Sequence, residues 1–109
     1  MPHTISTHVL DTETGQPAAG VPVRLSHILA DGATVPAGSG HTDADGRIRE
    51  LLEGDLVAGN YRLTFEVHAY RPRCFFREVS LEVSIEDASR SYHVPLLVAP
   101  YSISSYRGS

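Results

Sequence analysis

Two histidines lie within apolar runs, where an imidazole could serve chemistry. His8 precedes Val9 and Leu10, and His93 precedes Val94 near the other end of the chain. A neutral imidazole has a pKa of about 6.5, so it can take a proton from water near neutral pH and return it during a reaction. One histidine in such a setting is more often structural, but two in one small domain, with no cysteine or carboxylate cluster beside them, weaken that interpretation.

The remaining four of the six histidines lie in polar surroundings. His3 is near the start of the chain, His27 and His41 lie beside turns, and His68 lies on the polar face of an expected strand. Solvent exposure is the simplest interpretation of each.

Arg47 is a third candidate, because it follows the Asp45-Gly46 turn directly and opens a strand. Its guanidinium could hold an anionic, planar substrate through paired hydrogen bonds. Taken alone, a solvated charge beside a turn is the simpler interpretation.

The sequence finishes on Tyr106-Arg107-Gly108-Ser109, close behind the apolar run from Val94 to Tyr101. Ends of domains are usually polar and frayed. A phenol, a guanidinium and a carboxylate within four positions form either a solvated tail or part of a polar site.

Other kinds of site find no support. There is no Gly-x-Ser-x-Gly elbow, no Gly-rich phosphate loop and no ligand spacing for zinc or calcium. The single cysteine, Cys74, excludes an intrachain disulfide. We therefore expect no metal site, and we expect covalent acyl transfer to be the weaker route.

Charge and hydropathy limit the partners. A net charge of −4, with signs well mixed, disfavours nucleic-acid binding, and no apolar stretch approaches a membrane-spanning length. The N-terminal residues lack the basic and apolar regions of a secretory signal, and the last residues are not a peroxisomal signal. We expect a cytoplasmic location, or a periplasmic one if a leader has been removed.

Strands must position these side chains, because apolar and polar residues alternate with a period of two. The alternation is clear in Tyr61–His68 and Val79–Glu86, is shorter in Val21–Leu25, and is mixed in Thr4–Leu10. Turn residues between these runs predict an all-β antiparallel sandwich of seven to eight strands, in a single domain over residues 1–109. The leucine spacing in Glu50–Val57 predicts one short helix. So small a domain favours a site in a surface groove or between subunits over an internal cavity.

Several stretches match a family pattern. The less specific ones are Gly15–Val23, Thr42–Arg47 and Gly59–Leu63, which many prealbumin-like sandwiches share. The more specific ones are Ser6-Thr7-His8-Val9-Leu10-Asp11, Tyr92-His93-Val94-Pro95-Leu96-Leu97, Pro100-Tyr101-Ser102 and the terminal Tyr106-Arg107-Gly108-Ser109. Through them the chain resembles the transthyretin-like 5-hydroxyisourate hydrolases of purine catabolism, from Ile5 to Ser109. It departs from the family at Ile48-Arg49-Glu50, where a cysteine- or proline-containing stretch is more usual.

The resemblance implies a transthyretin-like fold and a homotetramer, built as a dimer of dimers with sites in a channel between dimers. It implies a catalytic set of His8, Arg47, His93 and Ser109, and a substrate-binding set that adds Tyr106, Arg107 and Gly108. The reaction it implies is hydrolysis of 5-hydroxyisourate to 5-hydroxy-2-oxo-4-ureido-2,5-dihydro-1H-imidazole-5-carboxylate, in the degradation of urate to allantoin. Water would attack a ring carbonyl without metal or organic cofactor.

In that mechanism one of His8 and His93 takes the proton of the attacking water, and the other orients or protonates the leaving group. Arg47 holds substrate oxygens and stabilises the oxyanion, while Tyr106 and Ser109 shape the wall of the site. The sequence leaves open which histidine is the base.

Two other classes of protein remain as alternatives. A transthyretin-like carrier would bind an apolar small molecule in the same channel, and would favour an apolar lining over two histidines and an arginine. An adhesive β-sandwich module of a larger surface protein would be accompanied by a signal peptide, repeats or a linker.

Overall fold

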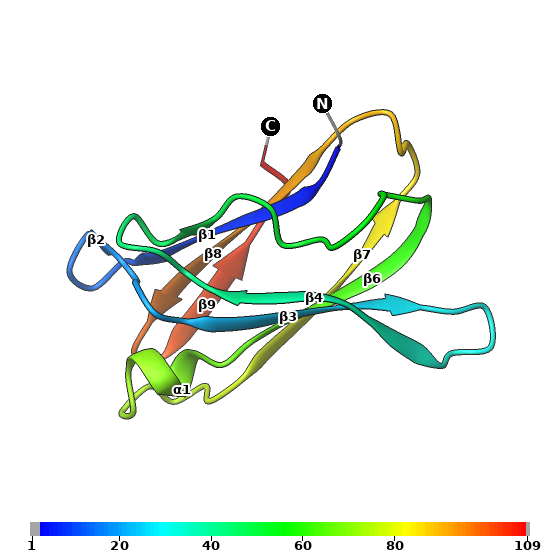
Figure 1. Cartoon of the computed structure of the whole chain (residues 1–109). Coiled ribbons are helices and arrows are strands. Elements are labelled where there is room, and N and C mark those ends of the chain that lie inside the picture. The colour runs from blue at the N-terminus through cyan, green and yellow to red at the C-terminus, as the bar shows by residue number, and fades with distance from the viewer. Residues whose placement is uncertain (1–2, 109) are drawn as a thin grey trace.

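Two β-sheets packed face to face make up most of the chain, as the alternation of apolar and polar side chains predicts (Figure 1). The computed structural model describes residues 3–108. Within that range there are nine strands, two of them only two residues long, and one helix of four residues. The prediction of an all-β sandwich with one short helix is confirmed, although the helix lies elsewhere in the chain.

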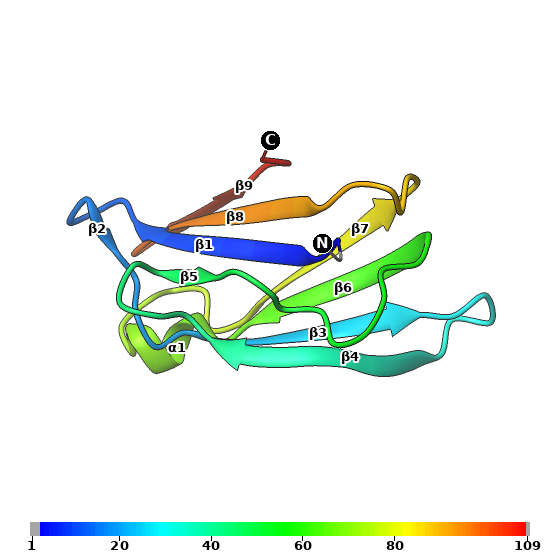
Figure 2. The ribbon, with the colours of Figure 1, turned by 45° about the horizontal axis from the view of Figure 1, so that its top comes forward.

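The first sheet has the strand order β2-β1-β8-β9, and β5 also pairs with β1. Its strands are β1 (Ile5–Asp11), β2 (Gln16–Pro17), β5 (Arg47–Ile48), β8 (Tyr92–Ala99) and β9 (Ser102–Ser105). The second sheet has the order β4-β3-β6-β7. Its strands are β3 (Pro22–Ile28), β4 (Thr34–His41), β6 (Gly59–Phe65) and β7 (Val79–Ile85). Figure 2 shows the sheets as two layers, with the first above the second.

The two layers enclose a hydrophobic core to which both sheets contribute. Strand β1 turns Ile5 and Val9 inward, where neither is exposed to solvent, and β6 contributes the fully buried Phe65. Successive side chains of a strand point to opposite faces. The half-buried Ser6 and His8 therefore lie on the outer face of the first sheet.

One strand pair departs from the expected antiparallel arrangement, because β1 and β8 run parallel. Alternation indicates which face a side chain occupies, but it does not indicate which strand lies beside it. A parallel pair needs a long connection, and here the whole second sheet lies between the two strands in sequence. Their register places Ser6 opposite His93 and His8 opposite Pro95. The first and last parts of the chain therefore meet along their length.

The predicted helix over Glu50–Val57 is wrong, since this segment is irregular. Its backbone instead joins the two layers: the Leu51 N–H donates to the carbonyl of Ile5 at 2.9 Å, and the Glu53 N–H donates to the carbonyl of Ala37 at 2.8 Å. Leu51 is buried, so the leucine spacing reflects side chains inserted between sheets rather than one face of a helix.

The helix is α1 (Val67–Tyr70), which directly follows β6. The alternation predicted a strand as far as His68, but pairing of β6 with β7 ends where Phe65 meets Val79. The next residues form one helical turn that buries Val67.

A buried carboxylate attaches this helix to the first sheet. Asp11 is 1% exposed and accepts hydrogen bonds from the Tyr70 hydroxyl at 2.9 Å and from the Arg71 guanidinium. Arg71 also pairs with Glu13. The corner between β1 and the helix is therefore held by charge as well as by packing.

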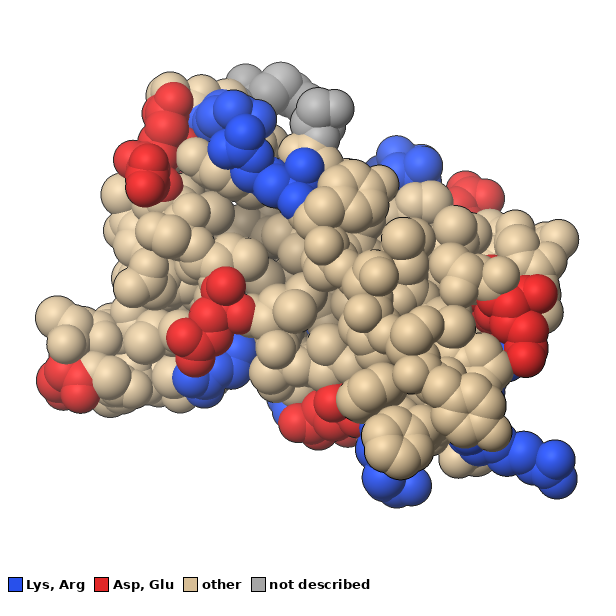
Figure 3. All heavy atoms as spheres, turned by 180° about the vertical axis from the view of Figure 1, so that it is seen from behind, with Lys and Arg blue, Asp and Glu red and all other residues tan. Residues whose placement is uncertain are grey.

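The length of the helix and the distribution of surface charge are relevant to the kinds of partner. In the part of the chain that the structure describes, no helix is long and apolar enough to cross a membrane. On the face drawn in Figure 3, acidic and basic side chains are scattered among uncharged ones.

Candidate active site

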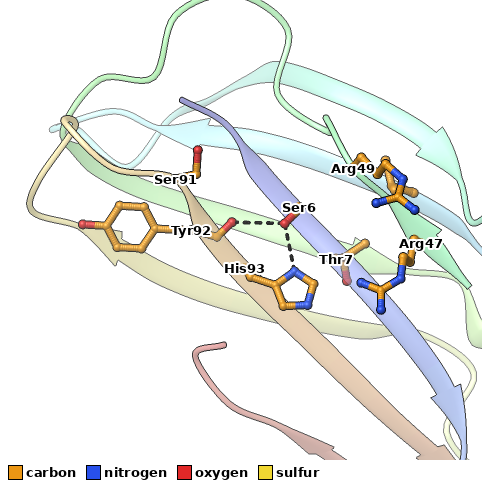
Figure 4. A pocket seen from close by; sticks show the side chains of 8 residues that line it. Ser6, Thr7, Arg47, Arg49, Ser91, Tyr92 and His93 are labelled. Atoms are coloured by element: carbon orange, nitrogen blue, oxygen red, sulfur yellow. Dashed lines mark hydrogen bonds between the residues drawn. The ribbon is translucent and has the colours of Figure 1, made fainter. Parts of the chain in front are cut away.

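His93 lies on the outer face of the first sheet, where β1 and β8 run side by side. The alternation of β8 buries Tyr92 and Val94 and leaves His93 half-buried. The Ser6 hydroxyl lies 2.8 Å from Nδ1 of His93 (Figure 4). The parallel register produces this contact, because it pairs these two residues directly.

The surroundings of His93 keep its ring uncharged. Its pKa lies below the ordinary value of about 6.5, chiefly because the ring is removed from water. The positive charges of Arg47 and His8 lower the pKa further. At neutral pH the imidazole is therefore neutral, and one ring nitrogen can accept a proton.

Arg47 is positioned by a tight turn that is fastened to β1. The Asp43 carboxylate accepts the backbone N–H groups of Asp45 and Arg47, at 2.8 and 3.0 Å. Gly46 has a φ of 75°, and a Cβ there would lie 2.5 Å from the carbonyl oxygen of Val9, so glycine is required. The Val9 N–H donates to the carbonyl of Gly46 at 2.7 Å. These bonds place Arg47 at the edge of β1.

His8 lies on the same outer face, two residues after Ser6. It pairs with Arg47 across β1 and β5 and is half-buried. Its charge contributes to the low pKa of His93. The structure thus brings His8, Arg47 and His93 to one face of one sheet, and their catalytic roles stay predictions.

A hollow of about 410 Å³ opens beside these residues. Its lining residues are Ser6, Thr7, Arg47, Ile48, Arg49, Ser91, Tyr92 and His93 (Figure 4). His8 is not among them. Within residues 3–108, neither Arg47 nor Arg49 forms an ion pair with a carboxylate. Two guanidinium groups at one hollow produce a positive potential that favours an anionic or oxygen-rich planar ligand.

Ser6, Arg49 and Ser91 are residues of this hollow that the sequence did not single out. The period of two could have indicated two of them, since Ser6 shares a face with His8 and Arg49 follows Arg47 by two positions. Ser91 precedes β8 and carries no such signal.

The described residues of the terminal tetrapeptide, 106–108, lie in two different places. Gly108 donates its N–H to the carbonyl of His93 at 2.8 Å, and a Cβ on Gly108 would lie 2.6 Å from Cδ2 of the ring. Tyr106 and Arg107 line a second hollow of about 380 Å³, beside β7 and β8. Ser109 lies outside the described residues. Contact of these four residues with substrate stays a prediction.

The other histidines are distributed over distant parts of the surface. His3 and His41 are exposed, as expected. His27 is half-buried and stacks on Tyr61 with ring centroids 4.7 Å apart, so full solvation was wrong for it. His68 donates from Nδ1 to the carbonyl of Arg77 at 2.8 Å.

Metal ligation needs several donors in one place. Among the described residues, no three His, Cys, Asp or Glu side chains are grouped so that they could hold a metal ion.

Comparison with known proteins gives consistent results. The family model described as the HIUase/Transthyretin family matches residues 5–108. The 5-hydroxyisourate hydrolase of Deinococcus radiodurans is 43% identical over 114 residues, which cover 96% of this chain and 95% of that protein. The Arabidopsis thaliana uric acid degradation bifunctional protein TTL is 40% identical over 121 residues, and the chain spans only 37% of that longer protein.

Solved structures agree in fold. The Klebsiella pneumoniae 5-hydroxyisourate hydrolase superposes with a TM-score of 0.83 at 39% identity, covering 98% of this chain and 99% of that one. Sea bream transthyretin in complex with thyroxine gives a TM-score of 0.88 at 28% identity, covering 95% and 93%. The sandwich is thus common to a hydrolase and to a transthyretin that binds thyroxine.

Proposed function

The chain belongs to the HIUase/Transthyretin family, and we propose that it acts as a hydrolase on 5-hydroxyisourate at the hollow beside His93 and Arg47. The reaction adds water across a ring amide and yields 5-hydroxy-2-oxo-4-ureido-2,5-dihydro-1H-imidazole-5-carboxylate, a step in the degradation of urate to allantoin. The observation that carries this proposal is a neutral imidazole beside a guanidinium that, within residues 3–108, forms no ion pair with a carboxylate, both at one open hollow.

His93 is the general base in this proposal. Its low pKa keeps the ring neutral, and it lines the hollow, whereas His8 does not. The ring takes a proton from water as the water oxygen bonds to the ring carbonyl carbon of the substrate. Acid–base catalysis of this kind contributes about 10² to 10⁴-fold to a rate.

Arg47 and His8 complete the reaction. The Arg47 guanidinium donates hydrogen bonds to the carbonyl oxygen as it becomes negative, and one such donor is worth about 3 kcal/mol in the transition state. The ring C–N bond then breaks, and the nitrogen receives a proton from the histidine pair and becomes part of the ureido group. The carbonyl carbon becomes the carboxylate of the product, and the positive potential of the hollow also favours this negative charge.

A homotetramer, built as a dimer of dimers, is the assembly we propose. The hollow lies on an outer sheet face rather than in a closed cavity, so a facing subunit would shield it from water. Large apolar side chains also remain exposed on the single chain, including Phe75 at 69% and Tyr101 at 81%. Patches of this kind often mark protein–protein contacts. Light scattering coupled to size-exclusion chromatography measures the assembly directly.

The test of function uses freshly generated 5-hydroxyisourate, whose decay is followed by ultraviolet absorbance with and without protein. We expect acceleration by the native chain and a loss of about 10²-fold or more in His93→Gln. His41→Gln is the matched control, because it removes an exposed imidazole from the other sheet. Decay at the uncatalysed rate in the presence of folded native protein contradicts the enzyme, and binding without turnover favours a carrier.

A further inference from the structure

The hydroxyl of Ser6 has two hydrogen-bond partners on β8. It lies 2.8 Å from Nδ1 of His93 and 3.5 Å from the carbonyl oxygen of Tyr92, and Figure 4 shows both contacts. A hydroxyl has one proton to donate and lone pairs with which to accept. A carbonyl can only accept, so the Ser6 hydroxyl can donate either to Tyr92 or to Nδ1 of His93. The direction of the Ser6–His93 bond then determines which nitrogen of the neutral ring carries the proton.

Only one direction leaves a base in the hollow. If Ser6 donated to Nδ1, then Nε2 of neutral His93 would carry the proton and could not accept another. If Ser6 donates to the carbonyl of Tyr92, it accepts the Nδ1–H of His93, and Nε2 is free. Figure 4 shows this second nitrogen turned away from Ser6, on the side of Arg47.

We propose that Ser6 is a positioning residue for His93: it accepts a hydrogen bond from the Nδ1–H, donates its own hydrogen bond to the carbonyl of Tyr92, and so presents an unprotonated Nε2 to the hollow. The inference rests on the proposed function, in which His93 is the base. Ser6 itself need not touch the substrate. Its role is that of the group that orients a catalytic histidine and fixes its tautomer.

Within residues 3–108, Ser6 is the one hydrogen-bond partner of Nδ1 of His93. Gly108 lies against the ring edge at Cδ2, on the C-terminal side. Among the residues that the structure describes, the charged and titratable groups that face His93 are His8 on β1 and Arg47 on β5, with Arg49 on the same hollow. None of these groups accepts a hydrogen bond from Nδ1, so Ser6 is the partner that sets the tautomer.

The direction of the bond fixes the sign of a pH effect. A bond accepted from Nδ1–H strengthens when the ring becomes an imidazolium, so Ser6 raises the pKa of His93 relative to a ring without it. Its removal should move the acid limb of the kcat/KM profile to lower pH. A bond donated by Ser6 to Nδ1 would stabilise the neutral ring, and its removal would move that limb to higher pH.

Ser6→Ala is the principal variant. We expect kcat to fall by about 10 to 100-fold, as for loss of a group that orients a metal-bound histidine, with little change in KM. Ser6→Thr keeps a hydroxyl on a strand residue and should recover most of the activity. Ser80→Ala is the matched control: it removes a hydroxyl that bonds a side chain, at Thr64, on the other sheet. Thermal unfolding verifies that each variant folds.

Nitrogen-15 NMR of labelled histidine reads the tautomer without any turnover, and His93→Gln identifies the signal. We expect Nδ1–H in the native chain and loss of that fixed tautomer in Ser6→Ala. A native ring protonated on Nε2, an acid limb that moves to higher pH, or unchanged kcat in folded Ser6→Ala each overturns the proposal. If the native chain fails to hydrolyse 5-hydroxyisourate, the proposed function fails, while the NMR result still decides whether Ser6 sets the tautomer.

Discussion

Replacement of Gly108 by alanine tests whether the position of His93 controls the reaction. An added Cβ would lie 2.6 Å from Cδ2 and 3.2 Å from Cγ of the ring. Carbon atoms in favourable contact are about 3.5 Å apart or more, so the ring must move by about 1 Å. The backbone at Gly108 does not need the left-handed conformation, so alanine adds a clash without adding backbone strain.

The expected cost is in catalysis. A displacement of about 1 Å can lower a rate by about 10²-fold when it separates reacting groups. We therefore expect Gly108→Ala to lower kcat for decay of 5-hydroxyisourate by about that factor. KM should change less, since Arg47 and its turn are untouched. Stopped-flow absorbance over a range of substrate concentrations separates the two constants.

Gly40→Ala is the control for a glycine-to-alanine change. Its Cβ would meet Ile48 at 3.6 and 3.7 Å, which is ordinary contact, and it leaves the ring of His93 alone. Native kcat in a folded Gly108→Ala protein would refute the reasoning, because it would mean either that the ring does not move or that its position does not matter.

Two further predictions concern titration. In an NMR titration, the pKa of the His93 imidazole should lie below about 6.5. Arg47→Gln should raise that pKa, because it removes a positive charge that disfavours the imidazolium. An unchanged pKa in Arg47→Gln contradicts the electrostatic account. Burial alone would raise the pKa of Asp11, but hydrogen bonds from Tyr70 and nearby backbone groups, together with the charge of Arg71, outweigh it and lower the pKa. The Asp11 carboxylate therefore stabilises the fold above its unfolded pKa of about 3.9, and loses this effect as the pH falls through the lower folded value. Asp11→Asn should cost about 2 kcal/mol of unfolding free energy at pH 7, with a difference from the native chain that shrinks in acid; an equal difference at every pH in urea titrations would contradict the ionic origin.

Alternation in the sequence predicted the strands well, because burial of one face is a local property. It could not predict partners, which is why the parallel pairing of β1 with β8 was missed. It also failed where side chains enter the core from irregular backbone. Leu51 and Leu56 are both buried, yet the segment that carries them crosses between sheets instead of coiling.

The site was predictable to the extent that its chemistry is carried by distinctive residue types. His8, Arg47 and His93 stood out by charge or by setting, and the fold brings them to one face. Ser6 did not stand out, because a serine in a strand is common and its significance depends on the register with His93. Arg49 could not be predicted as a site residue for a similar reason, since only the three-dimensional arrangement shows the hollow that it lines.

The parallel pairing of β1 with β8 has a consequence for how the protein folds. Ser6 and His93 are 87 positions apart, so their hydrogen bond closes one of the longest loops that this polypeptide can form. Contacts of such separation form late and slow the folding of β-rich proteins. During synthesis, the edge of β1 that pairs with β8 stays uncovered until β8 emerges. Only then does the imidazole of His93 gain Ser6 as its partner. Enzymatic turnover would thus report that β1 and β8 have paired, because no partly assembled intermediate without that pairing contains the bonded Ser6–His93 unit.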